Sequence, residues 1–143
     1  MSFDDLPDDW PSRPLTEPAL VADVLDLVVS RLSRDRGALY LLLCDDADRL
    51  LVPVAVDEVE REQTPRQRAD LVATVLDLAA QTAPVGSLLA AIARPGGLSV
   101  TADDQSWADA VAVGVAGRTR LLGVHLVTPD GSRPLPRQVS GAA

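Results

Sequence analysis

The residues SLLAAIARPGGLSVTADD, at positions 87–104, carry the strongest indication of a fold in this 143-residue chain. This stretch begins with an apolar run over residues 88–93, which is typical of a buried β-strand. The run ends at RPGG, a sequence that favours a loop. The residues TADD at the end of the stretch then predict the start of a helix. A strand followed by a glycine-containing loop and a helix is the usual place for a ligand site in α/β proteins.

The segments around this stretch alternate between helical and strand patterns. We predict helices over residues 17–35, 64–82 and 102–116, and strands over residues 38–44, 50–57, 88–93, 120–128 and 132–135. The order α-β-β-α-β-α-β predicts a three-layer α/β sandwich with a mixed sheet, in which the first two strands form a hairpin. The first strand is apolar on both faces and is therefore predicted to be central. Pro53 places the second strand at an edge or at a bulge.

The length of the chain is that of one domain. We expect a single α/β domain over residues 16–135. Residues 1–15 carry four aspartates and three prolines, which predicts a flexible acidic arm, and residues 136–143 are predicted to be a flexible tail. Trp10 in this arm is a candidate for a contact with the body of the domain or with a partner.

The composition argues against several classes of function. The formal net charge is -8, and all 13 Lys+Arg residues are arginine, which is typical of a GC-rich bacterial genome. Nucleic acids and anionic membranes are bound by clustered positive charge, so we expect neither as a partner. No apolar run reaches the ~18 residues of a membrane span, and the start of the chain lacks the pattern of a signal peptide. We therefore expect a cytoplasmic protein.

The chain has one cysteine and one histidine. A lone cysteine excludes an internal disulfide, and the apolar run around Cys44 predicts a buried small hydrophobic residue. His125 lies inside a predicted strand and cannot form a zinc site by itself, so we interpret it first as a structural imidazole. We expect no bound metal, no cofactor and no catalytic residue of the serine-nucleophile kind.

The loop of residues 94–104 supplies most of the candidate ligand-binding residues. The candidates are Arg94, Gly96, Gly97, Thr101, Asp104 and, from the later strand, His125. The two glycines can present backbone amides to an anion, and an arginine can hold an anionic group with two hydrogen bonds. The glycine spacing matches neither nucleotide-binding fingerprint. The threonine and the aspartate three residues later are equally well explained as the cap of the following helix.

The element order and the TADD sequence resemble the JAB/MPN metalloprotease-like fold, which includes the RadC-type bacterial proteins, over residues 37–135. In that family a strand ends in an H-x-H pair, a loop with proline and glycine follows, and S-x-x-D opens a helix. Both histidines and the aspartate of that family hold zinc. Here Asp104 is similar to that aspartate, but the spacing places Ala91 and Ala93 where the histidines stand. The resemblance implies a domain without the metal, and metal-free members serve as scaffolds or interaction modules.

Two functions follow from these observations. The first is a non-catalytic domain that binds another protein or a second copy of itself. The alternative is a small-ligand binder or an enzyme that uses a cleft around Arg94, Asp104 and His125.

Overall fold

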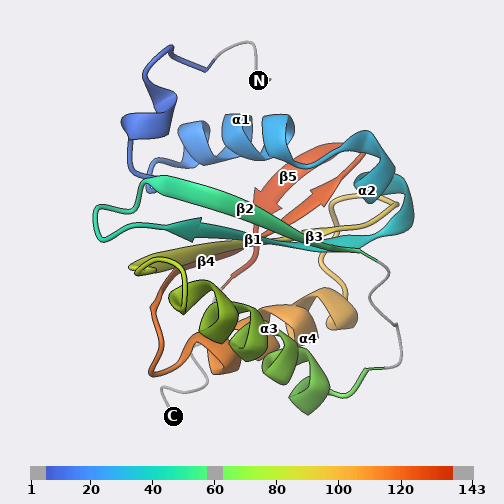
Figure 1. Cartoon of the computed structure of the whole chain (residues 1–143). Coiled ribbons are helices and arrows are strands. Elements are labelled where there is room, and N and C mark those ends of the chain that lie inside the picture. The colour runs from blue at the N-terminus through green and yellow to red at the C-terminus, as the bar shows by residue number, and fades with distance from the viewer. Residues whose placement is uncertain (1–5, 58–62, 137–143) are drawn as a thin grey trace.

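The computed structural model describes residues 6–57 and 63–136 (Figure 1). Its elements are η2 (Trp10–Ser12), α1 (Pro18–Val28), α2 (Arg31–Arg36), β1 (Ala38–Cys44), β2 (Leu50–Asp57), α3 (Pro65–Ala80), β3 (Ser87–Ala93), α4 (Ala102–Val115), β4 (Arg120–Thr128) and β5 (Gly131–Pro134). This order of helices and strands confirms the predicted α/β fold.

The five strands form one open, mixed sheet in the order β2-β1-β3-β4-β5. β1 runs antiparallel to both of its neighbours, and β3 runs parallel to β4. Every residue of β1 is buried, which confirms the central position predicted for this strand. The two edge strands each carry a proline, Pro53 in β2 and Pro134 in β5. Because proline has no amide hydrogen, it limits the pairing of a further strand at either edge.

Helices cover both faces of the sheet (Figure 1). α1 and α2 lie on one face, and α3 and α4 lie side by side on the other. Alternate residues of β1 serve the two resulting cores: Tyr40 and Leu42 belong to the core under α1, and Leu39 and Leu41 to the core under α3 and α4. None of the helices in the part of the chain that the structure describes is long and apolar enough to cross a membrane.

The prediction of one helix over residues 17–35 is wrong, because this segment forms α1 and α2. Ser30 lies between them with an extended backbone and begins the second helix, since its hydroxyl oxygen accepts a hydrogen bond of 3.0 Å from the amide of Ser33. A serine that caps a helix cannot continue the preceding one. The break turns Leu32 away from the apolar stripe of α1 and leaves it 58% exposed.

The described part of the N-terminal segment lies against the domain. Leu15 is buried and donates its amide to the carbonyl oxygen of Asp48 at 2.8 Å. Leu6 and Trp10 pack against the core under α1, which agrees with one of the two roles expected of this tryptophan. Residues 1–5 and 137–143 lie outside the described residues, so the flexible arm and tail stay predictions.

Candidate functional site

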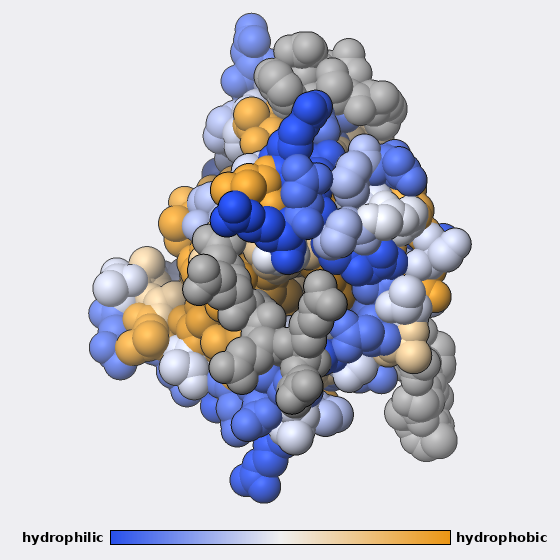
Figure 2. Space-filling view, turned by 90° about the vertical axis from the view of Figure 1, so that its right-hand side faces the viewer, coloured by the Kyte–Doolittle hydropathy of each residue, from blue (hydrophilic) through white to orange (hydrophobic). Residues whose placement is uncertain are grey.

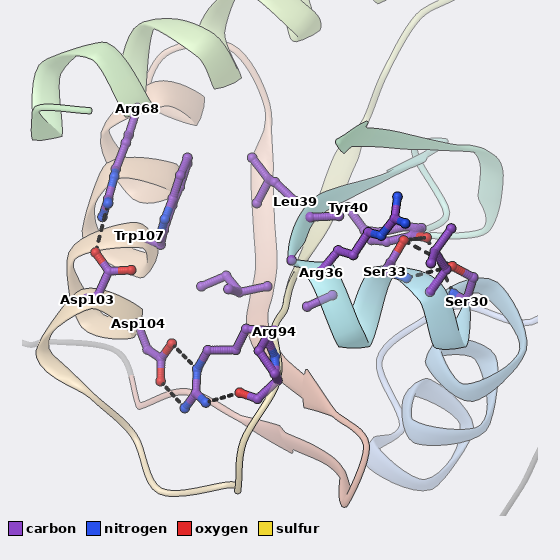
Figure 3. Close-up of a pocket in the computed structure, with 16 residues that line it drawn as sticks. Ser30, Ser33, Arg36, Leu39, Tyr40, Arg68, Arg94, Asp103, Asp104 and Trp107 are labelled. Atoms are coloured by element: carbon purple, nitrogen blue, oxygen red, sulfur yellow. Dashed lines mark hydrogen bonds and ion pairs between the residues drawn. The ribbon is translucent and has the colours of Figure 1, made fainter. Parts of the chain in front are cut away.

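A pocket of about 700 Å³ opens where β1 begins and β3 ends (Figure 3). One wall comes from α2 and the start of β1, and the opposite wall comes from α3 and α4. Figure 2 looks onto this end of the molecule. The charged residues that line the pocket are Arg36, Arg68, Arg94, Asp103 and Asp104. Ligand sites of α/β proteins commonly lie at the carboxyl end of a strand that leads into a helix, as β3 leads into α4.

Arg94 and Asp104 hold each other at one side of this pocket. Nε and Nη2 of Arg94 donate to the two carboxylate oxygens of Asp104 at 2.8 and 2.7 Å, in the fork geometry that makes such pairs strong. The guanidinium also donates to the carbonyl oxygens of Pro95 and Ser99, each at 2.9 Å. The loop after β3 is therefore built around the side chain of Arg94. All three of its nitrogens have partners within the protein, so we assign Arg94 a structural role.

Thr101 and Asp104 form the capping box of α4, as the helix-capping interpretation predicted. The amide of Asp104 donates to the hydroxyl oxygen of Thr101 at 3.1 Å, and the amide of Thr101 donates to the carboxylate of Asp104 at 2.9 Å. Burial by itself raises the pKa of Asp104, but the hydrogen bonds from Arg94 and Thr101 outweigh it and lower the pKa. The hydrogen bond to Asp104 in turn raises the pKa of Arg94. Both groups are therefore charged at neutral pH, and neither is poised to exchange a proton.

The glycines of the loop make the turn and do not line the pocket. Gly96 has φ +98°, a conformation that residues with a Cβ rarely adopt, and a Cβ there would lie 3.2 Å from Nη1 of Arg94. Gly97 has no such requirement, because a Cβ on it would lie 3.7 Å from the nearest atom, on Asp130. Thr101 likewise lies outside the pocket lining. An anion site on the amides of this loop stays a prediction.

The structure does not bring His125 together with Arg94 and Asp104. His125 lies on β4, opposite Ala91 of β3 in the sheet register. Ala91 belongs to the core under α1, whereas Leu126, the neighbour of the histidine in the chain, belongs to the core under α3 and α4. The imidazole is thus on the α1 face, and Asp104 is on the α4 face. The cleft predicted around these three residues is not formed.

We expect His125→Gln to reduce the loss of stability in mild acid. Burial lowers the pKa of His125 from 6.5 to about 4. Between these values the unfolded chain binds a proton that the folded chain does not, so stability is retained above pH 6.5 and falls as the pH drops toward 4. By pH 5 this effect amounts to about 2 kcal/mol. Urea unfolding at pH 7 and pH 5 should show that loss in the wild type and not in the variant, and an equal loss in both proteins would contradict the assignment.

The other side of the pocket is organised by Arg68, which is almost completely buried. Its guanidinium lies 4.5 Å from the ring centroid of Trp107 and donates to the carboxylate of Asp103 at 2.7 Å. A further hydrogen bond of 3.3 Å reaches the hydroxyl of Ser106. These contacts join α3 to α4, and the stacking of a guanidinium on an indole adds to the stability of the joint.

The wall formed by α2 carries hydroxyl groups and one arginine. The hydroxyls of Ser33 and Tyr40 are hydrogen-bonded at 2.8 Å, and that of Ser30 donates to Ser33 at 3.0 Å. Arg36 is exposed and makes no ion pair with any residue that the structure describes. Of the three guanidinium groups in the described part of the lining, only that of Arg36 is left for a ligand.

The described lining of the pocket has few side chains of the kinds that commonly transfer protons or act as nucleophiles. The described residues of the lining include no histidine, cysteine, lysine or glutamate, and the serine hydroxyls have no adjacent base to activate them. Within residues 6–57 and 63–136, no group of three or more His, Cys, Asp or Glu side chains could hold a metal ion. Cys44 is fully buried, as predicted, and burial raises the pKa of its thiol to about 11, so the unreactive protonated form prevails.

Three pocket residues were not predicted from the sequence: Arg36, Arg68 and Trp107. One signal was present, because Arg68 lies four and eight residues before Val72 and Leu76 and so falls on the buried face of α3. A charged residue in a buried stripe needs a partner, and this requirement points to an internal ion pair. No comparable signal marked Arg36, whose place in the pocket depends on the packing of α2 beside β1.

No family model, curated protein or solved structure matches the chain. The resemblance to metal-free JAB/MPN domains therefore stays a prediction. Ala91 and Ala93, which that resemblance places at the histidine positions, are buried in the core under α1.

Proposed function

We propose that this chain is a non-catalytic binding domain whose partner is another protein. The observation that supports the proposal is a surface that we call the apolar flank. It consists of exposed Leu51 and Val52 of β2 and Leu78 of α3, with half-buried Val54, Val56, Leu71 and Val75. Figure 1 shows the start of β2 and the end of α3 on the same side of the molecule, at the left of that view. Exposed apolar surface of this kind is typical of a protein-interaction site.

The charge of the chain favours a different protein over a second copy. At a net charge of -8, two copies repel each other. Exposed Asp70 of α3 neighbours Leu71 in the chain and places a negative charge beside the flank, whereas Asp77 beside Leu78 is paired with Arg118. We therefore expect a partner whose apolar contact surface is bordered by basic residues. Pro53 limits strand pairing at this edge, so side-chain packing carries the contact.

Leu78→Asp is expected to abolish partner binding, because a charged group would be buried against an apolar surface. Leu78 is 58% exposed, so the variant should fold normally. The immobilised chain would be used to recover proteins from an extract of the source cells, with the amount of each quantified. We expect the partner to be reduced about tenfold or more with this variant.

Val113→Asp is the matched control, since Val113 is 65% exposed on α4 and lies outside the flank. The control should recover the partner at the wild-type level. Recovery that is insensitive to Leu78→Asp, or self-association of the pure chain at micromolar concentration, would overturn the proposal. Thermal unfolding of both variants shows whether a loss of binding reflects a loss of folding.

Small-ligand binding in the pocket is a second proposed function, favoured by the pocket's size and lining. Its volume of about 700 Å³ lies within the usual range for small-molecule sites, and its wall combines apolar side chains with a few charged groups. The sequence also suggested an enzyme that uses a cleft around Arg94, Asp104 and His125. The described residues of the pocket give no support to that alternative.

A further inference from the structure

Among the residues that the structure describes, the pocket lining carries more positive than negative charge, although the chain has a net charge of -8. These residues include three arginines and two aspartates, and the two aspartates are taken by Arg68 and Arg94. The excess positive charge belongs to Arg36. A single free guanidinium suits a monoanion, and its planar fork of donors matches a carboxylate best. A phosphate dianion would bring a second negative charge that this one guanidinium leaves unpaired.

The rest of the lining is suited to an apolar body. Leu32 and Arg36 are four residues apart on α2, so they lie on the same face of that helix and both line the pocket. Leu39 and Ile92, from neighbouring strands of the sheet, line it as well. Leu32 is 58% exposed, and a ligand would remove that apolar surface from water. Figure 3 shows Arg36 on the same side as Ser33 and Tyr40, with Asp104 and Trp107 opposite.

We propose that the pocket binds a small apolar carboxylate, whose carboxylate group is held by Arg36 and whose apolar body packs on Leu32, Leu39 and Ile92. This inference rests on the small-ligand binding proposed above. The hydroxyls of Ser30 and Ser33 already form hydrogen bonds within the protein, so Arg36 provides the main polar contact to the ligand. Leu32 provides most of the apolar surface that the ligand would remove from water.

Sodium decanoate is a suitable probe for this site, measured by amide chemical shifts and by calorimetric titration of the full chain. We expect Arg36→Gln to weaken decanoate binding about tenfold or more, the usual effect of losing a hydrogen bond between charged groups. Arg31→Gln is the matched control, because Arg31 is an exposed arginine of the same helix that does not line the pocket. The control should change affinity less than about twofold. Leu32→Ser is a second test, and it should weaken binding through the lost apolar contact.

Parallel titrations with 1-decanol and inorganic phosphate separate the outcomes. Weaker binding of decanol than of decanoate, with no binding of phosphate, supports the proposal. Equal binding of decanol and decanoate, unaffected by Arg36→Gln, would overturn the carboxylate assignment while leaving small-ligand binding in place. Phosphate binding that depends on Arg36 would overturn it in favour of a phosphate ligand. No shift at pocket residues with any probe would remove both the assignment and the second proposed function.

Discussion

Arg94→Ala is expected to lower the free energy of unfolding at pH 7 by about 3–5 kcal/mol, the usual cost of removing one partner of a buried ion pair. The carboxylate of Asp104 is 1% exposed and would be left without its two hydrogen bonds from the guanidinium. The loop after β3 would also lose the donor that binds the carbonyl oxygens of Pro95 and Ser99. Urea unfolding of the wild type and the variant at pH 7 measures the difference.

The pH dependence of this difference has a definite sign. In the wild type the pKa of Asp104 is lowered, so its contribution to stability is present above the unfolded pKa of 3.8 and is lost as the pH falls. Without Arg94, burial dominates and the pKa of Asp104 should rise above that value. The variant would then lose stability as the pH rises through the new folded pKa. We therefore expect the gap between the two proteins to be widest near pH 7 and to narrow toward pH 3.5.

Two further variants test the cause of this effect. Arg94→Lys keeps the charge but not the fork of donors, so its loss should be smaller than that of Arg94→Ala. The double variant Arg94→Ala with Asp104→Asn removes the buried charge and should lose the pH dependence of the gap. A gap that stays constant from pH 7 to pH 3.5 in the single variant would show that the ion pair is not its source.

Gly114→Ala is expected to destabilise the protein by about 2 kcal/mol, the typical cost of an overpacked contact. A Cβ at this position would lie 2.8 Å from the carbonyl oxygen of Ala69 and 2.8 Å from Cβ of Val72. Both atoms belong to α3, so the two helices would have to separate. In an open helix the same substitution would instead gain about 1 kcal/mol from helix propensity. Chemical unfolding at pH 7 shows whether the substitution lowers or raises the free energy of unfolding.

Val113→Ala is the matched control for this variant, since its side chain is 65% exposed on the same helix. It should change the free energy of unfolding by less than about 0.5 kcal/mol. A Gly114→Ala protein more stable than the wild type would show that α3 and α4 do not depend on this close approach.

Local signals predicted the parts of the fold that depend on a few neighbouring residues. Pro53 marked an edge strand because a missing amide is tolerated only where no partner needs it. Thr101 and Asp104 marked the start of α4 because both partners of a capping box lie within one helical turn. Ser30 carried the same kind of signal, but the apolar stripe on either side masked the boundary between α1 and α2.

Partners brought together by packing could not be predicted in the same way. Arg94 was expected to face a ligand, and it faces Asp104 because α4 folds back over the end of β3. His125 was expected near both residues, and the alternation of β4 puts it on the other face of the sheet. The positions of both side chains depend on how the helices pack against the two faces of the sheet.

Residues 87–104 contain both features that local sequence signals predict and contacts that depend on tertiary packing. The buried strand, the loop at the glycines and the capped helix could be predicted from the residues, because each of these depends on short-range backbone preferences. The enclosure of Arg94 by the loop, and the meeting of Arg36 and Arg68 with this stretch at one pocket, depend on how distant segments pack. Those arginines lie far from the stretch in the chain, and the packing of α2, α3 and α4 around the sheet brings them to it.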